Sequence, residues 1–198
     1  ALVGENMSEK RNHFSANYDW IRKALMFEPR GHDMMSGAFL YPPCSAGADA
    51  SILFIETSGC LPMCGHGTIG TVTAALESGL LHPKTPGKLI LDAPAGQIQV
   101  EFDLKDGKVE WVKLFNVASF LAYKDVHVEV PQLGYLKVDI AYGGNFYIIV
   151  EPQRNFPGID KYSAEQILRY SPVIREIINH QLECVHPQDH SVSGASHV

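Results

Sequence analysis

The sequence lacks both a long hydrophobic run and a basic block. No apolar run reaches the roughly 18 residues that a membrane-spanning helix requires. The 16 lysines and arginines are outnumbered by 22 aspartates and glutamates, so the formal net charge is −6. A mildly acidic chain argues against nucleic acid or an anionic membrane as the main partner. The first residues show no basic segment followed by an apolar one, so we expect no signal peptide.

Cysteine is also scarce, with only four residues: Cys44, Cys60, Cys64 and Cys184. Nothing in the sequence suggests secretion, and a chain of 198 residues does not need disulfides to fold. We therefore expect free thiols in a reducing, cytoplasmic compartment. Cys60 and Cys64 form a C-x3-C pair, but a structural zinc site would need a second Cys or His pair at similar spacing. The histidines are scattered, so the sequence favours no metal and leaves zinc at this pair as the alternative.

The remaining composition is that of a globular protein, with 45% hydrophobic and 19% charged residues. The length suits one medium domain or two small ones. Apolar residues at helical spacing predict helices over residues 7–27, 65–76 and about 164–181, the last interrupted at Ser171-Pro172. Asn6 and Ser163 are the expected N-caps of the first and last helices, and Gly79 is the expected C-cap of the second. Residues 105–108, with Asp106-Gly107 at their centre, predict a hairpin turn. Strands are predicted over residues 38–41, 51–57, 89–92, 97–102, 109–117, 126–130, 136–141 and 146–150. The pattern indicates an α+β fold.

The most informative stretch runs from Ser58 to Gly70, where strand residues lead into a glycine-rich turn and then a helix. Cys64 falls at the start of that helix, where exposed N–H groups and the helix dipole favour a negative charge. We therefore expect a lowered pKa for its thiol. The N–H groups of Gly65 and its neighbours could hold a carboxylate, and His66 could orient a substrate. The alternative is an unreactive buried cysteine in an ordinary turn, which is how we interpret Cys60.

Four motifs along the chain resemble one family. Met63-Cys-Gly-His-Gly67 is similar to the first active-site signature of the proline racemase family. Met26-Phe-Glu-Pro-Arg-Gly-His-Asp33, Asp92-Ala-Pro-Ala-Gly96 and Ala141-Tyr-Gly-Gly-Asn-Phe-Tyr147 match further family segments in the family's order. The resemblance covers essentially the whole chain. Within the family, these motifs are most similar to those of 4-hydroxyproline 2-epimerases.

The resemblance implies a fold like half of diaminopimelate epimerase, a mixed sheet or barrel wrapped around a central helix. Family members use no pyridoxal phosphate and no metal, and two cysteines act on opposite faces of the substrate Cα. By resemblance, Cys64 is one of these cysteines, and Gly65 and His66 belong to the carboxylate-binding turn. Ser36 falls where proline racemases carry a bulky Phe, so it leaves room for a ring hydroxyl. A surface loop serine is the alternative.

The sequence departs from the family in its second half. The second cysteine motif, Ser-Pro-Cys-Gly-Thr-Gly, is absent, and Cys184 is followed by Val-His-Pro instead. We therefore expect residues 1–198 to be an N-terminal epimerase domain with a linker towards a missing second domain, inactive alone. The expected substrate is 4-hydroxyproline or proline, and a homodimer is one possible assembly. A 3-hydroxyproline dehydratase of the same family and a non-catalytic fragment that only binds or assembles are the alternatives.

Overall fold

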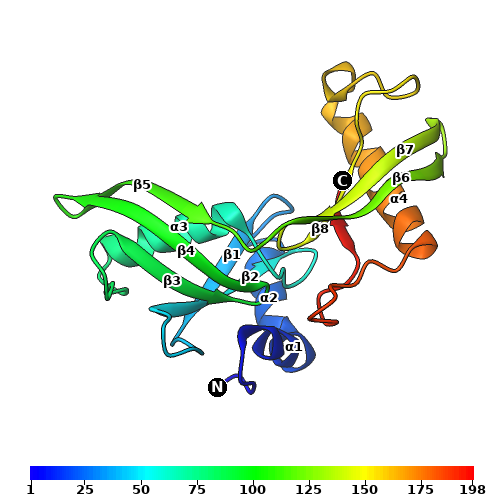
Figure 1. Cartoon of the computed structure of the whole chain (residues 1–198). Helices are drawn as coiled ribbons and strands as arrows, with labels where there is room; N and C mark the ends of the chain where they lie inside the picture. The colour runs from blue at the N-terminus through cyan, green and yellow to red at the C-terminus, as the bar shows by residue number, and fades with distance from the viewer. The chain divides into compact units, whose positions relative to one another are not determined.

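The computed structural model describes all of residues 1–198. The chain forms two compact units, Ala1–Val117 and Ala118–Val198. Each unit has its own sheet and its own helices (Figure 1). That residues 1–198 act as a single N-terminal epimerase domain stays a prediction.

The first unit is built on a five-stranded mixed sheet. Its strands follow the order β1-β2-β3-β4-β5; β2 and β3 run parallel, and the other neighbours are antiparallel. Its elements are α1 (Met7–Asn17), α2 (Asp19–Met26), β1 (Ser36–Tyr41), β2 (Ala50–Glu56), α3 (Gly65–Glu77), β3 (Lys88–Ala93), β4 (Gly96–Lys105) and β5 (Lys108–Phe115). The α+β class is confirmed.

Strand β2 lies between two hydrophobic cores, which explains its unbroken apolar sequence. Ile52 and Phe54 belong to the core that includes α3, strand β3 and strand β4. Leu53 and Ile55, on the opposite face, belong to the core that includes α1 and α2. Successive side chains of a strand point to opposite faces, so a strand covered on both sides has no polar alternation. Helix α3 therefore lies against one face of the sheet, where it starts next to the end of β2.

The first predicted helix, over residues 7–27, is divided by Tyr18 into α1 and α2. Tyr18 leaves the helical conformation at φ −131°, and the side chain of Asn17 donates to the carbonyl of His13 at 2.9 Å. A new helix then begins with Asp19, whose carboxylate contacts Arg22 at 2.6 Å. The predicted cap is present, because Asn6 accepts the N–H of Glu9 at 2.9 Å.

Two turns of the first unit agree with their sequence signals. The tight turn between β4 and β5 places Asp106 and Gly107 at φ 51° and 77°, as a two-residue hairpin requires. Gly79 follows helix α3 at φ 67°, the left-handed conformation that often ends a helix.

The second unit consists of a four-stranded sheet in the order β6-β7-β8-β9 and one long helix. The elements are β6 (Phe120–Val130), β7 (Gly134–Tyr142), β8 (Phe146–Ile149), the short 3-10 helix η1 (Ile159–Lys161), α4 (Ala164–Gln181) and β9 (Ala195–His197). Strand β9 pairs parallel with β8 and lies in the tail, where the sequence predicted no element.

The expected interruption of α4 at Pro172 is wrong, since the helix continues through it. Proline removes the N–H that would bond to the carbonyl of Leu168. Leu168 is 74% exposed, so this turn of the helix faces solvent and water can satisfy the freed carbonyl.

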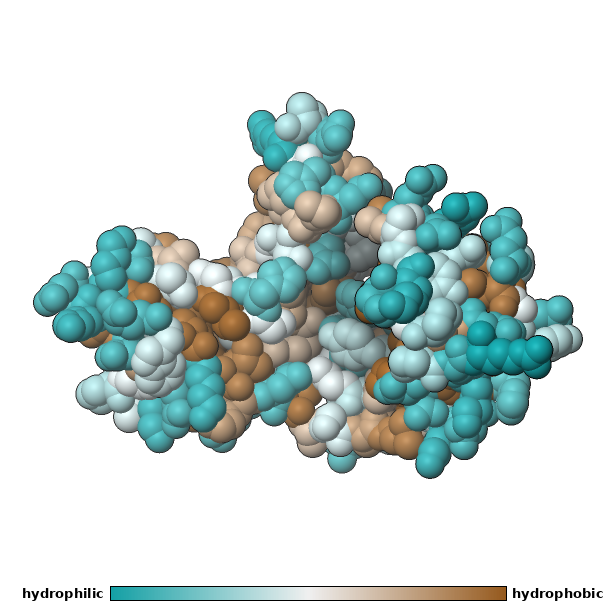
Figure 2. Space-filling view, turned by 90° about the horizontal axis from the view of Figure 1, so that it is seen from above, coloured by the Kyte–Doolittle hydropathy of each residue, from teal (hydrophilic) through white to brown (hydrophobic).

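Hydrophilic side chains cover most of the face seen in Figure 2, with apolar ones among them. No helix has the length and apolar character to cross a membrane.

Candidate active site

Cys64 is the N-cap residue of α3. Its backbone is extended at φ −145°, and its Sγ accepts the N–H of Gly67 at 3.4 Å. The residue is only 7% exposed. Gly65 and His66 occupy the first turn of the helix, where N–H groups have no acceptor within the helix. These two N–H groups are therefore suited to bind an anion such as a carboxylate.

Backbone contacts fix the turn that carries Cys64. Thr68 donates both its hydroxyl, at 2.8 Å, and its N–H, at 3.0 Å, to the carbonyl of Cys64. The N–H of Ala95 donates to the carbonyl of Pro62 at 3.0 Å. Since Ala95 belongs to the Asp92–Gly96 motif, this bond ties that motif to the residue just before the Met63–Gly67 motif.

Asp92 anchors the other end of that motif. Its carboxylate accepts the N–H of Cys44 at 2.9 Å and both the N–H and the hydroxyl of Ser45 at 2.8 Å. Burial alone would raise the pKa of Asp92, but the hydrogen bonds from Ser45, Gln97 and Cys44 together lower it. The Asp92 carboxylate is thus ionised, and its oxygens accept hydrogen bonds from other groups of the protein.

Gly67 allows the sulfur to lie close to the helix. A Cβ at this position would be 3.0 Å from Sγ of Cys64 and 3.2 Å from Cδ1 of Phe54, which is fully buried. At Gly65 a Cβ would meet only the side chain of Leu114, at 3.8 Å. The two glycines therefore differ: a Cβ at Gly67 would require its neighbours to shift by a few tenths of an ångström, whereas Gly65 has space beside it.

The structure brings Ser36 next to Cys64. Ser36 begins β1 and pairs across the sheet with Glu56, the last residue of β2. Its hydroxyl donates to Oε1 of Glu56 at 2.8 Å, and it lies close enough to Cys64 to lower the pKa of that thiol. Sequence reasoning missed Glu56, although its place at the end of an apolar strand, just before the turn, was a usable signal.

His66 lies near the sulfur but faces solvent. Its Nδ1 is 3.7 Å and its Nε2 3.9 Å from Sγ of Cys64. Which ring nitrogen carries the proton decides whether the imidazole donates to the sulfur or accepts from it.

The pKa of the Cys64 thiol is raised, contrary to the expectation from its place at a helix start. Burial is the largest cause, and the Glu56 carboxylate adds to it by repelling a second negative charge. The hydrogen bonds from Gly67 and Ser36 lower the pKa by less. The prediction assumed an exposed thiol, whereas this side chain is desolvated against the core of the first unit.

All four cysteines are free. Burial raises the pKa of Cys60, which is only partly exposed, as it does for Cys184 in the second unit. No group of three or more His, Cys, Asp or Glu side chains in residues 1–198 is arranged to hold a metal ion. The Cys60–Cys64 zinc alternative thus lacks further ligands in this structure.

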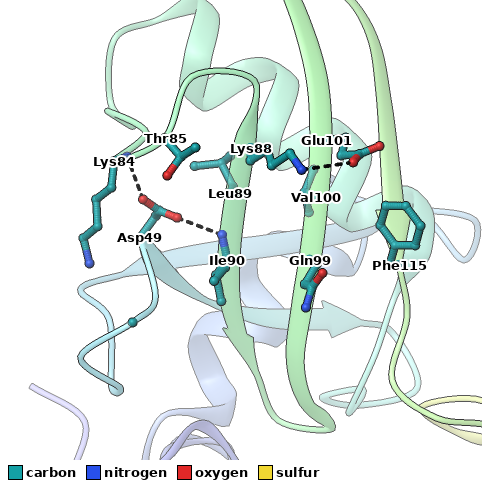
Figure 3. Close-up of a pocket in the computed structure, with 11 residues that line it drawn as sticks. Asp49, Lys84, Thr85, Lys88, Leu89, Ile90, Gln99, Val100, Glu101 and Phe115 are labelled. Carbon is teal, nitrogen blue, oxygen red and sulfur yellow. Dashed lines mark hydrogen bonds and ion pairs between the residues drawn. The ribbon is translucent and has the colours of Figure 1, made fainter.

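The first unit also has a pocket of about 310 Å³ whose lining does not include Cys64; it is formed by β3, β4, the end of β5 and the loops before β2 and β3 (Figure 3). Its charged groups contact other groups of the protein. The Asp49 carboxylate accepts the N–H groups of Lys84 at 2.9 Å and Ile90 at 2.7 Å, and Lys88 lies 3.6 Å from Glu101. The charged side chains of this pocket are thus paired, and Cys64 stays the best candidate.

Comparison with known proteins gives the family. The model of the family described as "Proline racemase" matches residues 1–198. The chain belongs to the proline racemase family. A relative of the same family, the 4-hydroxyproline 2-epimerase of Shewanella loihica, is 68% identical over 197 residues, which are 100% of this chain and 59% of the relative. The 4-hydroxyproline epimerase of Brucella ovis is 57% identical over the same shares.

Solved structures of proline racemase relatives share the fold. A hydroxyproline epimerase from Agrobacterium vitis with bound trans-4-hydroxy-L-proline matches with a TM-score of 0.89 and 25% identity, over 98% of this chain and 58% of that chain. A probable proline racemase from Agrobacterium radiobacter with bound carbonate gives a TM-score of 0.88 and 30% identity, over the same shares. The expected fold, half of a diaminopimelate epimerase-like protein, is confirmed. The chain spans about three fifths of the length of these relatives.

Proposed function

We propose that this chain supplies one of the two acid/base groups of a cofactor-independent epimerase that acts at Cα of 4-hydroxyproline. Cys64 is that group, and Gly65, His66 and Ser36 bind the substrate. The observation that carries the proposal is Cys64 itself: a thiol at the N-cap of α3, beside N–H groups without intrahelical partners. Relatives with 57–68% identity are named 4-hydroxyproline epimerases, which supports the choice of substrate.

The chemistry explains why a carboxylate-binding helix start belongs beside the thiol. The Cα–H bond of an amino acid is very weakly acidic, and its removal places negative charge on the carboxylate. Donors aimed at that charge stabilise the transition state; loss of one such donor typically costs about 2.7–4 kcal/mol. In this proposal, the N–H groups of Gly65 and His66 are these donors.

Inversion at one carbon requires an acid on one face and a base on the other. Cys64 lies on one side of the substrate, so a second group must act from the opposite side. Cys60 is not that group, because it lies near Arg22 and Asp19, on the side of the sheet that α1 and α2 cover. Cys184 lies in the second unit, without a glycine-rich turn after it. The 198 residues alone are therefore expected to be inactive as an epimerase.

Ser36 favours a hydroxylated substrate. Its hydroxyl lies beside the thiol, and its side chain is small enough to leave room for a ring substituent. A hydrophobic residue there would leave the substrate hydroxyl without a partner, at a cost of about 1–3 kcal/mol.

Cα exchange in deuterated water tests the proposal. Trans-4-hydroxy-L-proline is incubated with the complete polypeptide of the source gene and, separately, with residues 1–198, and the Cα signal is followed by proton NMR. We expect deuterium with inverted configuration from the complete polypeptide, and at most slow exchange with retention from the 198 residues. Inversion at an enzyme-like rate by the 198 residues would refute the two-group mechanism. Formation of a dehydrated product instead of the epimer would favour the dehydratase.

A further inference from the structure

Cys44 is a thiol that the proposed mechanism does not use, and its position is fixed by the fold. It lies just after β1, and its N–H donates to Oγ of Ser51 at 3.1 Å and to Oδ2 of Asp92 at 2.9 Å. Ser51 is a fully buried residue of β2, and Asp92 belongs to β3. The side chain of Cys44 packs against the core that includes α1 and α2. Two strands and one core therefore hold this residue in place.

A lysine amine from helix α1 contacts the sulfur of Cys44. Nζ of Lys10 lies 3.2 Å from Sγ, and it also donates to the carbonyl of Gly4 at 2.8 Å. Met7 and Phe14 anchor α1, because both are buried in the core against which Cys44 packs. The amine and the sulfur are 34 residues apart along the chain, yet the same part of the fold holds them in contact.

The surroundings of this sulfur suit an oxidation. The hydroxyl of Ser51 also donates to Sγ of Cys44, at 3.5 Å, so the sulfur accepts from two groups and one of them is cationic. A positive charge beside a cysteine makes it more reactive, because the thiolate is the form that peroxides oxidise. Cys44 and Lys10 are only half-buried, so a small oxidant can reach them. The first product, a sulfenic acid, condenses with a nucleophile held beside it.

We propose that Cys44 and Lys10 form a modification site, at which hydrogen peroxide joins the two side chains through a sulfur–nitrogen bond. The thiolate attacks one peroxide oxygen, the O–O bond breaks, and a sulfenic acid and hydroxide form. The hydroxide takes a proton from the Lys10 ammonium. The neutral amine then attacks the sulfur, the S–O bond breaks, and the hydroxide that leaves takes a second proton from the nitrogen.

The product is a sulfenamide that links α1 to the segment after β1. Sulfur loses two electrons, and the peroxide is reduced to two molecules of water, so atoms and electrons balance. A thiol reductant attacks the sulfur of such a bond and releases the amine, which makes the link reversible. The inference goes beyond the proposed function and does not depend on it, because neither side chain belongs to the site at Cys64.

Peptide mass spectrometry tests the proposal without any turnover. The complete polypeptide of the source gene is treated with a small molar excess of hydrogen peroxide and digested without reductant. We expect a peptide that contains Lys10 to be joined to one that contains Cys44, with a mass two hydrogen atoms below their sum. Dithiothreitol should release both peptides. The joined form should account for most of the Cys44 that peroxide oxidises.

Two variants separate the charge of Lys10 from its nucleophilic amine. Lys10→Arg keeps a cation beside the sulfur but removes the amine, so Cys44 should oxidise at about the wild-type rate and accumulate as the sulfenic acid, which dimedone traps. Lys10→Gln removes the charge as well, and oxidation of Cys44 should become about threefold to tenfold slower.

Cys60 is the matched control within the same sample. It is also a half-buried free thiol packed against the same core. Burial raises its pKa, and the cations that act on it are the guanidinium groups of Arg22 and Arg11, not an amine. Cys60 should therefore oxidise more slowly than Cys44 and form no bond to nitrogen.

Oxidation of Cys44 without a bond to Lys10 would overturn the proposal, as would a disulfide between Cys44 and another cysteine. A cross-link that persists in Lys10→Arg would also overturn it, because a different amine would then be the nucleophile. A Cys44 that peroxide leaves unchanged counts equally against it. If the variants fail to fold by circular dichroism, the wild-type peptides alone decide, since they identify both joined residues.

Discussion

Replacing Cys64 by serine separates catalysis from folding. Serine is a preferred N-cap residue, and its hydroxyl can accept the N–H of Gly67 as Sγ now does. Cysteine has no such preference, so the helix should lose nothing and gain at most about 1 kcal/mol. We therefore expect the free energy of unfolding to stay within about 1 kcal/mol of the wild type, which for the first unit, Ala1–Val117, is a change in Tm of about 4 °C.

Catalysis should respond very differently. A serine hydroxyl is a far weaker acid than a thiol, so it cannot exchange protons with Cα near neutral pH. Loss of a positioned acid/base group costs a factor of about 10² to 10⁴ in rate. The assay is kcat/KM for trans-4-hydroxy-L-proline in the complete polypeptide, followed by polarimetry, with urea unfolding of the same samples.

Cys60→Ser is the matched control. Cys60 is four residues away, is a half-buried free thiol, and packs against the other core, with α1 and α2. Its replacement should change kcat/KM by less than about threefold, because it does not contact the reacting atoms. Near-wild-type turnover in Cys64→Ser would refute the mechanism, and equal losses from both variants would point to a thiol pair or a shared metal.

Three further outcomes follow from the geometry. Gly67→Ala should lower kcat/KM about twofold to tenfold, because its Cβ requires Sγ to shift by a few tenths of an ångström, whereas Gly65→Ala should keep the thiol in place. Alkylation rates and kcat/KM measure both, and equal effects would contradict the contacts described. Ser36→Phe should lower kcat/KM for hydroxyproline more than for proline; unchanged discrimination would exclude Ser36 from the site. Asp19 has its pKa lowered from 3.8 to about 2 by its hydrogen bond to Arg22, so its stabilisation is present above about pH 4 and lost as pH falls through about 2. Urea unfolding of Asp19→Asn should therefore differ from wild type above that range and converge with it below.

The parts of the fold that the sequence predicted well are those where local chemistry decides the structure. The Asp106-Gly107 turn needs two residues with positive φ, and the Ser163 cap of α4 has its partner Gln166 three residues later. The doubly buried strand β2 was recognisable from its apolar run, because both faces are covered. In each case the required signal lies within a few residues.

The parts that the sequence did not predict depend on contacts distant along the chain. Strand β9 has only three residues and exists because β8 lies beside it. Pro172 is tolerated because its turn of α4 faces solvent, which no local pattern reveals. At the site, Glu56 lies beside Ser36, 20 residues earlier, through strand pairing, and the burial of Cys64 reverses the pKa shift that its helix position suggested.

The two compact units should also unfold separately. Each has its own sheet, and the hydrogen bonds of each sheet are formed within one unit. Ile178 on α4 is fully buried in the second unit. Ile178→Ala should cost about 2–5 kcal/mol there, from the lost burial and the cavity left behind.

Hydrogen exchange followed by mass spectrometry measures the two units within one sample. The amides of β7 in Ile178→Ala should exchange about 30-fold to several thousandfold faster than in wild type, while those of β2 keep their rates. Phe54→Ala, which empties a fully buried position in the first unit, is the reciprocal variant and should accelerate β2 but not β7. Because exchange of the most protected amides reports the unfolding of the unit that contains them, equal acceleration of both strands in either variant would mean that residues 1–198 unfold as one cooperative body.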